Sequence, residues 1–181
     1  MLIFVKKYLL QELSGTNMGI EILLVEEDFI LSKTDLKGKI TYCNNKFIEI
    51  SGYSREELIG KPHNILRDIT MPKIAFKILW DKIQNGEDFF GFVRNKTKNN
   101  DFYWVFTYVS PDYDIDHKII GYTSIRRQIS SNAISIITPI YEKLLELEKA
   151  SLFNAEDYLT KTLNDLNLSY SEFVLNIQKG E

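Results

Sequence analysis

The side chains that could carry out chemistry in this sequence are few and lie far apart. There are two histidines, His63 and His117, in separate expected loops, and a single cysteine, Cys43, in an expected strand. The spacings typical of zinc proteases, dithiol redox centres, serine hydrolases and phosphate-binding loops do not occur. No carboxylate pair is set apart by its spacing. The sequence therefore predicts a binding or signalling protein, with no catalytic residues, rather than an enzyme.

The composition fits one ordinary globular domain with attachments. The chain has 181 residues, a net charge of −3, 44% hydrophobic residues and 26% charged residues. An acidic balance gives no basic face for nucleic acid. No segment approaches the roughly 20 apolar residues that span a bilayer. One cysteine cannot form an internal disulfide and suits a reducing compartment. We therefore expect a cytoplasmic protein that meets a membrane only through a partner.

The most explicit local signals lie in residues 52–62. Ser54 and Glu57 have the spacing of a capping box, in which the side chain of each residue accepts a hydrogen bond from the backbone N–H of the other. Gly60 fits the position just past a helix, and Pro62 blocks its continuation. This stretch predicts a short capped helix followed by a tight turn.

Alternating apolar residues predict an antiparallel sheet around this centre. Strands are expected over residues 21–32, 39–43, 89–95, 102–109 and 119–126. A helix should begin at Pro72 and end near Asn85. The strand over 102–109 is apolar on both faces, so both of its faces should be covered.

The last 50 residues predict helices. Thr138 and Pro139 have the types expected at a helix N-cap and first helical residue. Apolar residues then recur at alternating spacings of four and three from Leu159 to Ile177, which is typical of a helix-pairing seam. The first helix could fold back on its own sheet or contact a partner. For the second we expect contact with another chain.

Several segments resemble PAS domains of the energy-taxis (aerotaxis) type, the Aer and CetB proteins. They read SKTDLKGKITYCNNKF, SGYSREELIGKPHN, AFKILW and NKTKNNDFYWV. The resemblance implies an α+β PAS fold: a five-stranded antiparallel sheet with flanking helices that form a small cage, here followed by a C-terminal helical extension. It divides the chain into an N-terminal extension (1–24), a PAS sensor domain (25–128) and C-terminal helices (129–181).

The resemblance also implies a function, because members of this family hold FAD and report its redox state to the chemotaxis machinery. This chain is similar to the split type, in which a small PAS protein works with a membrane-bound methyl-accepting chemotaxis receptor. We expect association with the inner membrane through that receptor. We also expect a homodimer formed through the sheet face and the C-terminal helices. The alternative is a cofactor-free PAS interaction or dimerisation module in bacterial signal transduction.

The FAD-pocket pattern of the family places the cofactor-binding residues at Asn44, Arg67, Phe76, Trp80, Phe89 and Asn95. An arginine there could form a charge-assisted fork with a pyrophosphate. The two asparagines offer both donors and acceptors to the polar edge of a flavin. The aromatic residues on the helix would form an apolar wall.

Two departures from the family pattern stand against FAD. The family has His-Pro-Asp after the matching arginine, where this chain has Asp68, Ile69 and Thr70, and Asp68 would offset the charge of Arg67 that a pyrophosphate needs. Phe89 replaces the tryptophan usual on the following strand.

The identity of the ligand therefore stays open between FAD, haem and an empty cage. Haem would use His63 or His117 as axial ligand. Flavin photoreceptors of the LOV group, which share the PAS fold, place a reactive cysteine where this chain has His63, so their adduct-forming photocycle is excluded. We expect Cys43 to be a small core residue.

Overall fold

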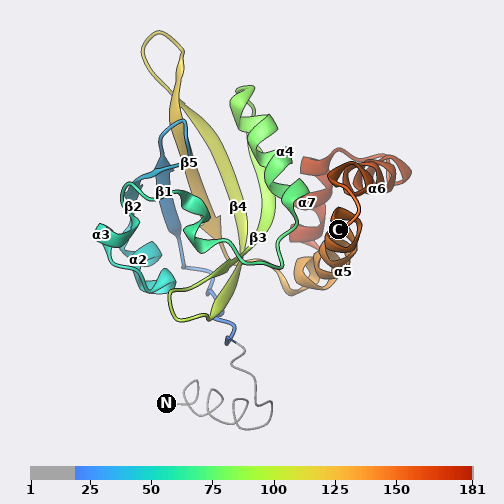
Figure 1. The fold of residues 1–181 in the computed structure, drawn as a ribbon, viewed down its shortest axis with the longest axis horizontal. Coiled ribbons are helices and arrows are strands. Elements are labelled where there is room, and N and C mark those ends of the chain that lie inside the picture. The colour runs from blue at the N-terminus through green and yellow to red at the C-terminus, as the bar shows by residue number, and fades with distance from the viewer. Residues whose placement is uncertain (1–18, 181) are drawn as a thin grey trace.

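The computed structural model describes residues 19–180, so most of the expected N-terminal extension (1–24) lies outside the described residues. At its centre is a five-stranded antiparallel sheet with the strand order β2-β1-β5-β4-β3. The strands are β1 (Ile30–Thr34), β2 (Ile40–Cys43), β3 (Phe89–Lys96), β4 (Phe102–Tyr113) and β5 (Ile119–Arg127). The expected α+β architecture is confirmed (Figure 1). The first strand is shorter than expected, because Glu21 forms only an isolated bridge with Phe102.

Helices between β2 and β3 cover one face of the sheet (Figure 1). They are α2 (Asn45–Ser51), α3 (Arg55–Leu58), the 3-10 helix η1 (His63–Leu66) and α4 (Lys73–Gln84). The capping box of Ser54 and Glu57 is confirmed at the start of α3. Gly52 ends α2 in the left-handed conformation, with φ 73°, which glycine adopts without steric cost. These two caps separate α2 from α3 by a tight turn.

The sheet has two distinct faces because side chains alternate along each strand. The register pairs Phe92 with Phe106 and Val93 with Val105 across β3 and β4. Odd-numbered residues of these two strands, such as Val93, point toward the helices. Even-numbered residues, such as Phe106, point to the opposite, outer face. The strands are therefore apolar on both faces, as the sequence predicts for β4.

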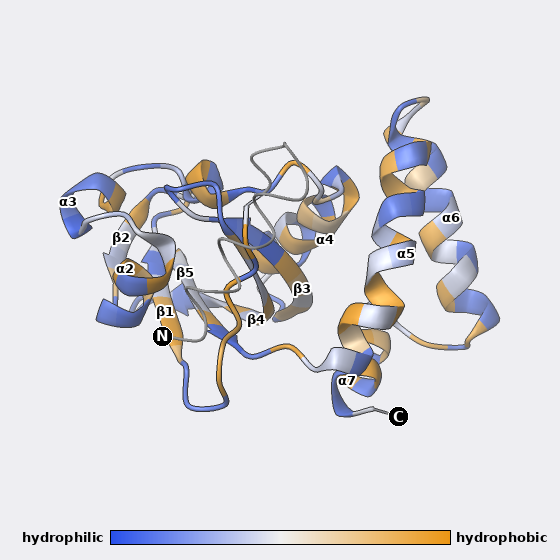
Figure 2. Ribbon diagram, turned by 90° about the horizontal axis from the view of Figure 1, so that it is seen from below, coloured by the Kyte–Doolittle hydropathy of each residue, from blue (hydrophilic) through white to orange (hydrophobic). Residues whose placement is uncertain are grey.

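The C-terminal helices pack side by side along β3 and α4 (Figures 1 and 2). They are α5 (Ser131–Glu148), α6 (Leu152–Asp165) and α7 (Tyr170–Lys179). No helix among residues 19–180 is long and apolar enough to cross a bilayer.

Two expectations for this tail are wrong in detail. The first helix begins at Ser131 rather than Pro139, because the Ser130 hydroxyl caps it by accepting from the Ala133 N–H. Pro139 lies inside this helix, at the cost of one backbone hydrogen bond. The second helix is interrupted after Asp165, where Asn167 is left-handed with φ 54° and Ser169 starts α7 with a new capping box.

The apolar seam of α7 is buried in its own chain rather than left for a partner. Tyr170, Phe173, Val174 and Ile177 are each at most 8% exposed. The ring of Tyr170 stacks on Phe89 of β3 with 6.0 Å between ring centroids. The three helices thus complete the core along one edge of the sheet.

A buried hydrogen bond joins this bundle to the edge strand. The Tyr141 hydroxyl of α5 donates to the Phe92 carbonyl of β3 at 2.8 Å, and its ring lies against Trp104 of β4 at 6.2 Å. An edge strand exposes unpaired backbone groups that can template aggregation unless something covers them. Tyr141 supplies a partner for one of these groups.

Tyr141→Phe removes this hydroxyl and leaves the Phe92 carbonyl buried without its partner. We expect the free energy of unfolding to fall by about 1–2 kcal/mol, as measured by urea denaturation. Tyr42→Phe is the control, since its side chain is 43% exposed. An equal loss in both variants would contradict the role of the Tyr141 bond.

Candidate functional site

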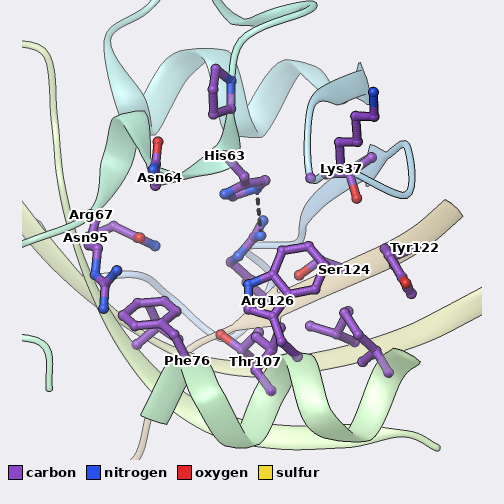
Figure 3. A pocket seen from close by; sticks show the side chains of 18 residues that line it. Lys37, His63, Asn64, Arg67, Phe76, Asn95, Thr107, Tyr122, Ser124 and Arg126 are labelled. Atoms are coloured by element: carbon purple, nitrogen blue, oxygen red, sulfur yellow. Dashed lines mark hydrogen bonds between the residues drawn. The ribbon is translucent and has the colours of Figure 1, made fainter. Parts of the chain in front are cut away.

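A cavity of about 220 Å³ lies between the inner face of the sheet and the helices η1 and α4. Figure 3 shows Arg67 and Asn95 at one side, Lys37 and Tyr122 at the other, and His63 bonded to Arg126 between them. Four of the six expected cofactor residues line this cavity: Arg67, Phe76, Trp80 and Asn95. The resemblance therefore pointed to residues that four times out of six line one cavity, and their contact with a cofactor stays a prediction.

One wall of the cavity is apolar and comes from a single helix. Phe76, Leu79, Trp80 and Ile83 of α4 line it, and their spacing places them on one helix face. Trp80 meets Tyr122 of β5 edge-on, with 5.7 Å between centroids and 86° between ring planes. This wall is suited to the flat, apolar face of a ring system.

Asn44 does not line the cavity. It is the N-cap of α2, and its Oδ1 accepts from the Phe47 and Leu31 amides at 3.1 Å each. Its Nδ2 donates to the Phe29 carbonyl at 2.7 Å. These bonds commit its amide to joining β1 to α2, so the expected contact with a cofactor is wrong.

Phe89 does not line the cavity either. It is 2% exposed and stacks on Tyr170 of α7, so the family's tryptophan position is used here for packing the C-terminal bundle. Cys43 is 0% exposed and is a core residue, as expected.

Arg126 is the most unusual residue of the site, and the sequence analysis missed it. It lies on the inner face of β5, is 5% exposed, and has no carboxylate within 4.0 Å among the described residues. Its Nη1 donates to the Ser32 hydroxyl at 3.2 Å and its Nη2 to His63 Nε2 at 2.8 Å. Burial lowers the pKa of Arg126 to about 10, so the guanidinium stays charged at neutral pH.

His63 is held as a neutral acceptor by this arrangement. Burial, and then the Arg126 charge, lower the pKa of His63 to about 3. Because Nε2 accepts from Arg126, we assign the remaining ring proton to Nδ1. A haem iron would have to displace Arg126 from Nε2. His117 is exposed in the turn between β4 and β5 and does not line the cavity, so neither histidine is presented as a haem ligand.

Three further polar atoms in the wall formed by the sheet have no hydrogen-bond partner among the described residues. They are Asn95 Nδ2, Thr107 Oγ1 and Ser124 Oγ, all buried. Such atoms are rare in folded proteins and usually indicate a missing partner. Thr107 and Ser124 were also missed by the sequence analysis. A signal existed, since Thr107 interrupts an apolar strand and Tyr122, Ser124 and Arg126 alternate along β5.

Asp68 does not neutralise Arg67, contrary to expectation. Its carboxylate accepts from the Thr70 amide and hydroxyl at 2.8 and 2.7 Å, and lies 3.3 Å from Arg94 Nε. The Arg67 guanidinium instead lies over the Phe76 ring, 3.9 Å from its centroid. Burial lowers the pKa of Arg67 and the charge of Glu148 works against this shift. Arg67 is half-buried whereas Arg126 is buried, and we call the Arg67 side of the cavity its mouth. The cation there is available to an anion.

The site combines an apolar wall, a polar wall and three cations, of which Lys37 is exposed, and holds no arrangement typical of catalysis by metal ions. Within residues 19–180, no group of three or more His, Cys, Asp or Glu side chains is placed to bind a metal. Chemically, the cavity can bind a planar molecule with apolar faces, a hydrogen-bonding edge and an anionic part outside.

The buried neutral state of His63 predicts a pH-dependent stability. Its folded pKa of about 3 lies below the ordinary value of 6.5, so the unfolded chain binds more protons between these values and stability falls as pH falls through this window. Between pH 7 and pH 5 we expect a loss of up to about 2 kcal/mol in the free energy of unfolding, measured by urea titration. His63→Gln should reduce this loss, whereas His117→Gln should leave it unchanged. Equal pH dependence in both variants would contradict the assignment.

Comparison with known proteins agrees with this fold. The family model described as "PAS fold" matches residues 28–129. The chain is 40% identical over 121 residues to the aerotaxis receptor of Escherichia coli K12, covering 67% of this chain and 24% of the receptor. It is 31% identical over 81 residues to the biofilm dispersion protein BdlA of Pseudomonas aeruginosa, covering 44% of this chain and 19% of that protein. The chain thus spans less than a quarter of the length of either relative.

Among solved structures, the LOV domain of the Erythrobacter litoralis EL346 blue-light activated histidine kinase has the same fold. It superposes with a TM-score of 0.52 at 23% identity, covering 57% of this chain and 97% of that domain. The family model covers more than half of the chain, and the matched residues contain the five-stranded sheet described above. The chain belongs to the PAS family, whose domains are sensory modules of signal transduction, and its PAS region is similar to that of the aerotaxis receptor.

Proposed function

We propose that the chain is a redox sensor that holds the ring system of FAD in this cavity and signals to a membrane-bound chemotaxis receptor. The observation that carries the proposal is the buried Arg126, which has no carboxylate partner, beside three polar atoms without partners. A buried charge in this state costs free energy unless something compensates it. A ligand with an electron-rich, hydrogen-bonding edge would provide that compensation.

The residues present suit a flavin in type and placement. Phe76, Leu79 and Trp80 would cover an apolar ring face, and Asn95 would meet the ring edge. The cavity is smaller than the roughly 300–1,000 Å³ typical of pockets that enclose a whole drug-sized ligand. The phosphates of FAD would therefore lie at the mouth, where Arg67 can bind them.

A bound FAD would supply the redox chemistry, exchanging electrons with the cell's oxidants and reductants. The protein's part is electrostatic: the Arg126 charge in a buried site favours a ligand state of greater negative charge. The hydroxyls of Thr107 and Ser124 can either donate or accept and so can adapt to a change in the ring edge. Because these residues lie on β4 and β5, a rearrangement of their hydrogen bonds would shift the strands of the sheet.

The proposed output follows from the relationship to the aerotaxis receptor. Residues 28–129 supply the sensor, and a separate methyl-accepting receptor would supply the membrane anchor and the signalling domain. The sensor would then be cytoplasmic and associated with the inner membrane through that receptor.

The first test is the absorption spectrum of the purified protein, before and after incubation with FAD. We expect flavin bands, and we expect Arg67→Ala to weaken FAD binding about 10- to 100-fold by removing a charged contact to phosphate, with little effect on riboflavin. Arg127→Ala is the matched control, since Arg127 is exposed and adjacent in sequence to Arg126 but outside the cavity. A protein that stays colourless after incubation with FAD would contradict the proposal.

A cofactor-free interaction module is the second candidate, and the outer face of the sheet favours it. Phe90 packs against Phe106 and Tyr108 at centroid distances of 6.3 and 5.0 Å, and all three rings are half-buried. Phe29, just before β1, is 37% exposed. A second copy of the chain packed on this face would bury these rings and form the expected homodimer. The C-terminal seam contributes less than expected, because it is buried within its own chain.

Phe90→Glu would place a charge in this aromatic row. If the outer face forms a homodimer, the variant should shift from dimer to monomer in light scattering after gel filtration, with an unchanged circular dichroism spectrum. Ile115→Glu is the control, because Ile115 is 96% exposed at the tip of the β4–β5 hairpin. A wild-type monomer, or a Phe90→Glu dimer, would remove this face as the interface.

A further inference from the structure

The helix that forms the apolar wall is held at its start by the C-terminal bundle. The N-cap of α4 is Pro72, which makes no side-chain cap. The first amides of a helix lack partners inside the helix. Glu148, the last residue of α5, supplies one: its Oε1 accepts from the Ile74 amide at 2.8 Å. A carboxylate from outside the family match therefore holds the beginning of the cavity wall.

The same carboxylate acts on the cation at the cavity mouth. Arg67 has no carboxylate within ion-pair distance among the described residues, and Asp68 is turned toward Thr70 and Arg94. Glu148 is the acidic residue whose charge favours the protonated form of Arg67, against burial, which lowers its pKa. Arg67, over the Phe76 ring, and Glu148, bonded to the Ile74 amide, thus both lie at the first turn of α4.

We propose that Glu148 is a positioning residue of the cavity and couples occupancy of the mouth to docking of the C-terminal helices on α4. The proposal rests on the proposed function, because it requires a ligand whose phosphate binds Arg67. A phosphate bound to Arg67 and the Glu148 carboxylate would both lie at the first turn of α4, where their negative charges would repel each other. Glu148 therefore lowers the affinity for phosphate-bearing ligands.

Thermodynamic reciprocity predicts how ligand binding would act on the C-terminal helices. If Glu148 weakens phosphate binding, a bound phosphate weakens the hold of Glu148 on α4 by the same free energy. Ligand binding would loosen the end of α5 from the start of α4. The C-terminal helices would thereby transmit the occupancy of the cavity to a partner.

One other charged contact links the bundle to α4, and it is weaker. Lys77 Nζ lies 2.9 Å from Glu156 of α6 but is shared with Asp81, and all three side chains are well exposed. Exposed ion pairs contribute little and are screened by salt. Glu148 instead forms a partly buried hydrogen bond to a backbone amide. This is the contact that a phosphate bound to Arg67 would weaken.

Ligand selectivity tests the coupling. Glu148→Gln keeps an acceptor for the Ile74 amide but removes the charge. Titration with riboflavin, FMN and FAD should show about three- to tenfold tighter binding of FMN and FAD than in the wild type, and unchanged binding of riboflavin. Glu146→Gln is the control, because Glu146 is exposed on the same helix and pairs with Lys143.

Hydrogen exchange of the Ile74 amide tests the positioning role without a ligand. Glu148→Ala should speed this exchange about fivefold or more in the ligand-free protein, as expected when a helix loses a cap of about 1 kcal/mol. In the wild type, FMN should speed it relative to riboflavin.

The outcomes separate the two proposals. An FMN-to-riboflavin affinity ratio that is equal in Glu148→Gln and wild type overturns the coupling while leaving the flavin site in place. Unchanged Ile74 exchange in Glu148→Ala overturns the positioning role. A wild-type protein that binds none of the three flavins overturns the proposed function and the coupling together, and Ile74 exchange then still decides the positioning role.

Discussion

The buried charge of Arg126 is the constraint on which the rest of the cavity depends. A guanidinium that is 5% exposed and lacks a carboxylate costs several kcal/mol relative to an apolar side chain of similar size. The ligand-free protein recovers part of this cost through Ser32 and His63. Each of these partners is then restricted, since His63 must remain neutral to accept from Arg126. A stable fold alone would be served as well or better by an apolar residue, so we attribute the charge to the proposed ligand.

The two arginines divide the site by chemistry. Arg126 lies at the inner, polar wall and faces Asn95, Thr107 and Ser124, which suits the edge of a ring. Arg67 lies at the mouth over Phe76, where a phosphate can keep part of its contact with water. An enclosed cavity with a single cation would suit a small anion. Two arginines, one at the polar wall and one over Phe76 of the apolar wall, fit a ligand with a ring at one end and a phosphate at the other.

Much of this structure could be predicted from the sequence, because the signals were local. The capping box at Ser54 and the alternation in β3 and β4 depend on neighbours within a few residues. What failed depends on distant partners. Asn44 has the right chemistry for a cofactor, but its partners across β1 and α2 cannot be read from spacing. Arg126 escaped notice because its face is fixed only by the register of β5 against β1 and β4. The start of α5 was predicted at Pro139 because proline favours the first turn of a helix. The helix instead begins earlier, at the Ser130 cap.

The replacement of His-Pro-Asp by Asp68, Ile69 and Thr70 need not abolish a flavin site. A proline stiffens a loop by fixing one dihedral angle. Here Asp68 stiffens the loop by accepting twice from Thr70 and by facing Arg94, which also keeps its charge away from Arg67. Ile69 is 93% exposed and outside the cavity. The loop thus replaces a covalent restraint with hydrogen bonds and leaves the mouth cation under the influence of Glu148, a residue of the C-terminal bundle. Under the proposed coupling, the C-terminal bundle acts on the cavity through Glu148, which caps the Ile74 amide at the start of the helix that forms the apolar wall.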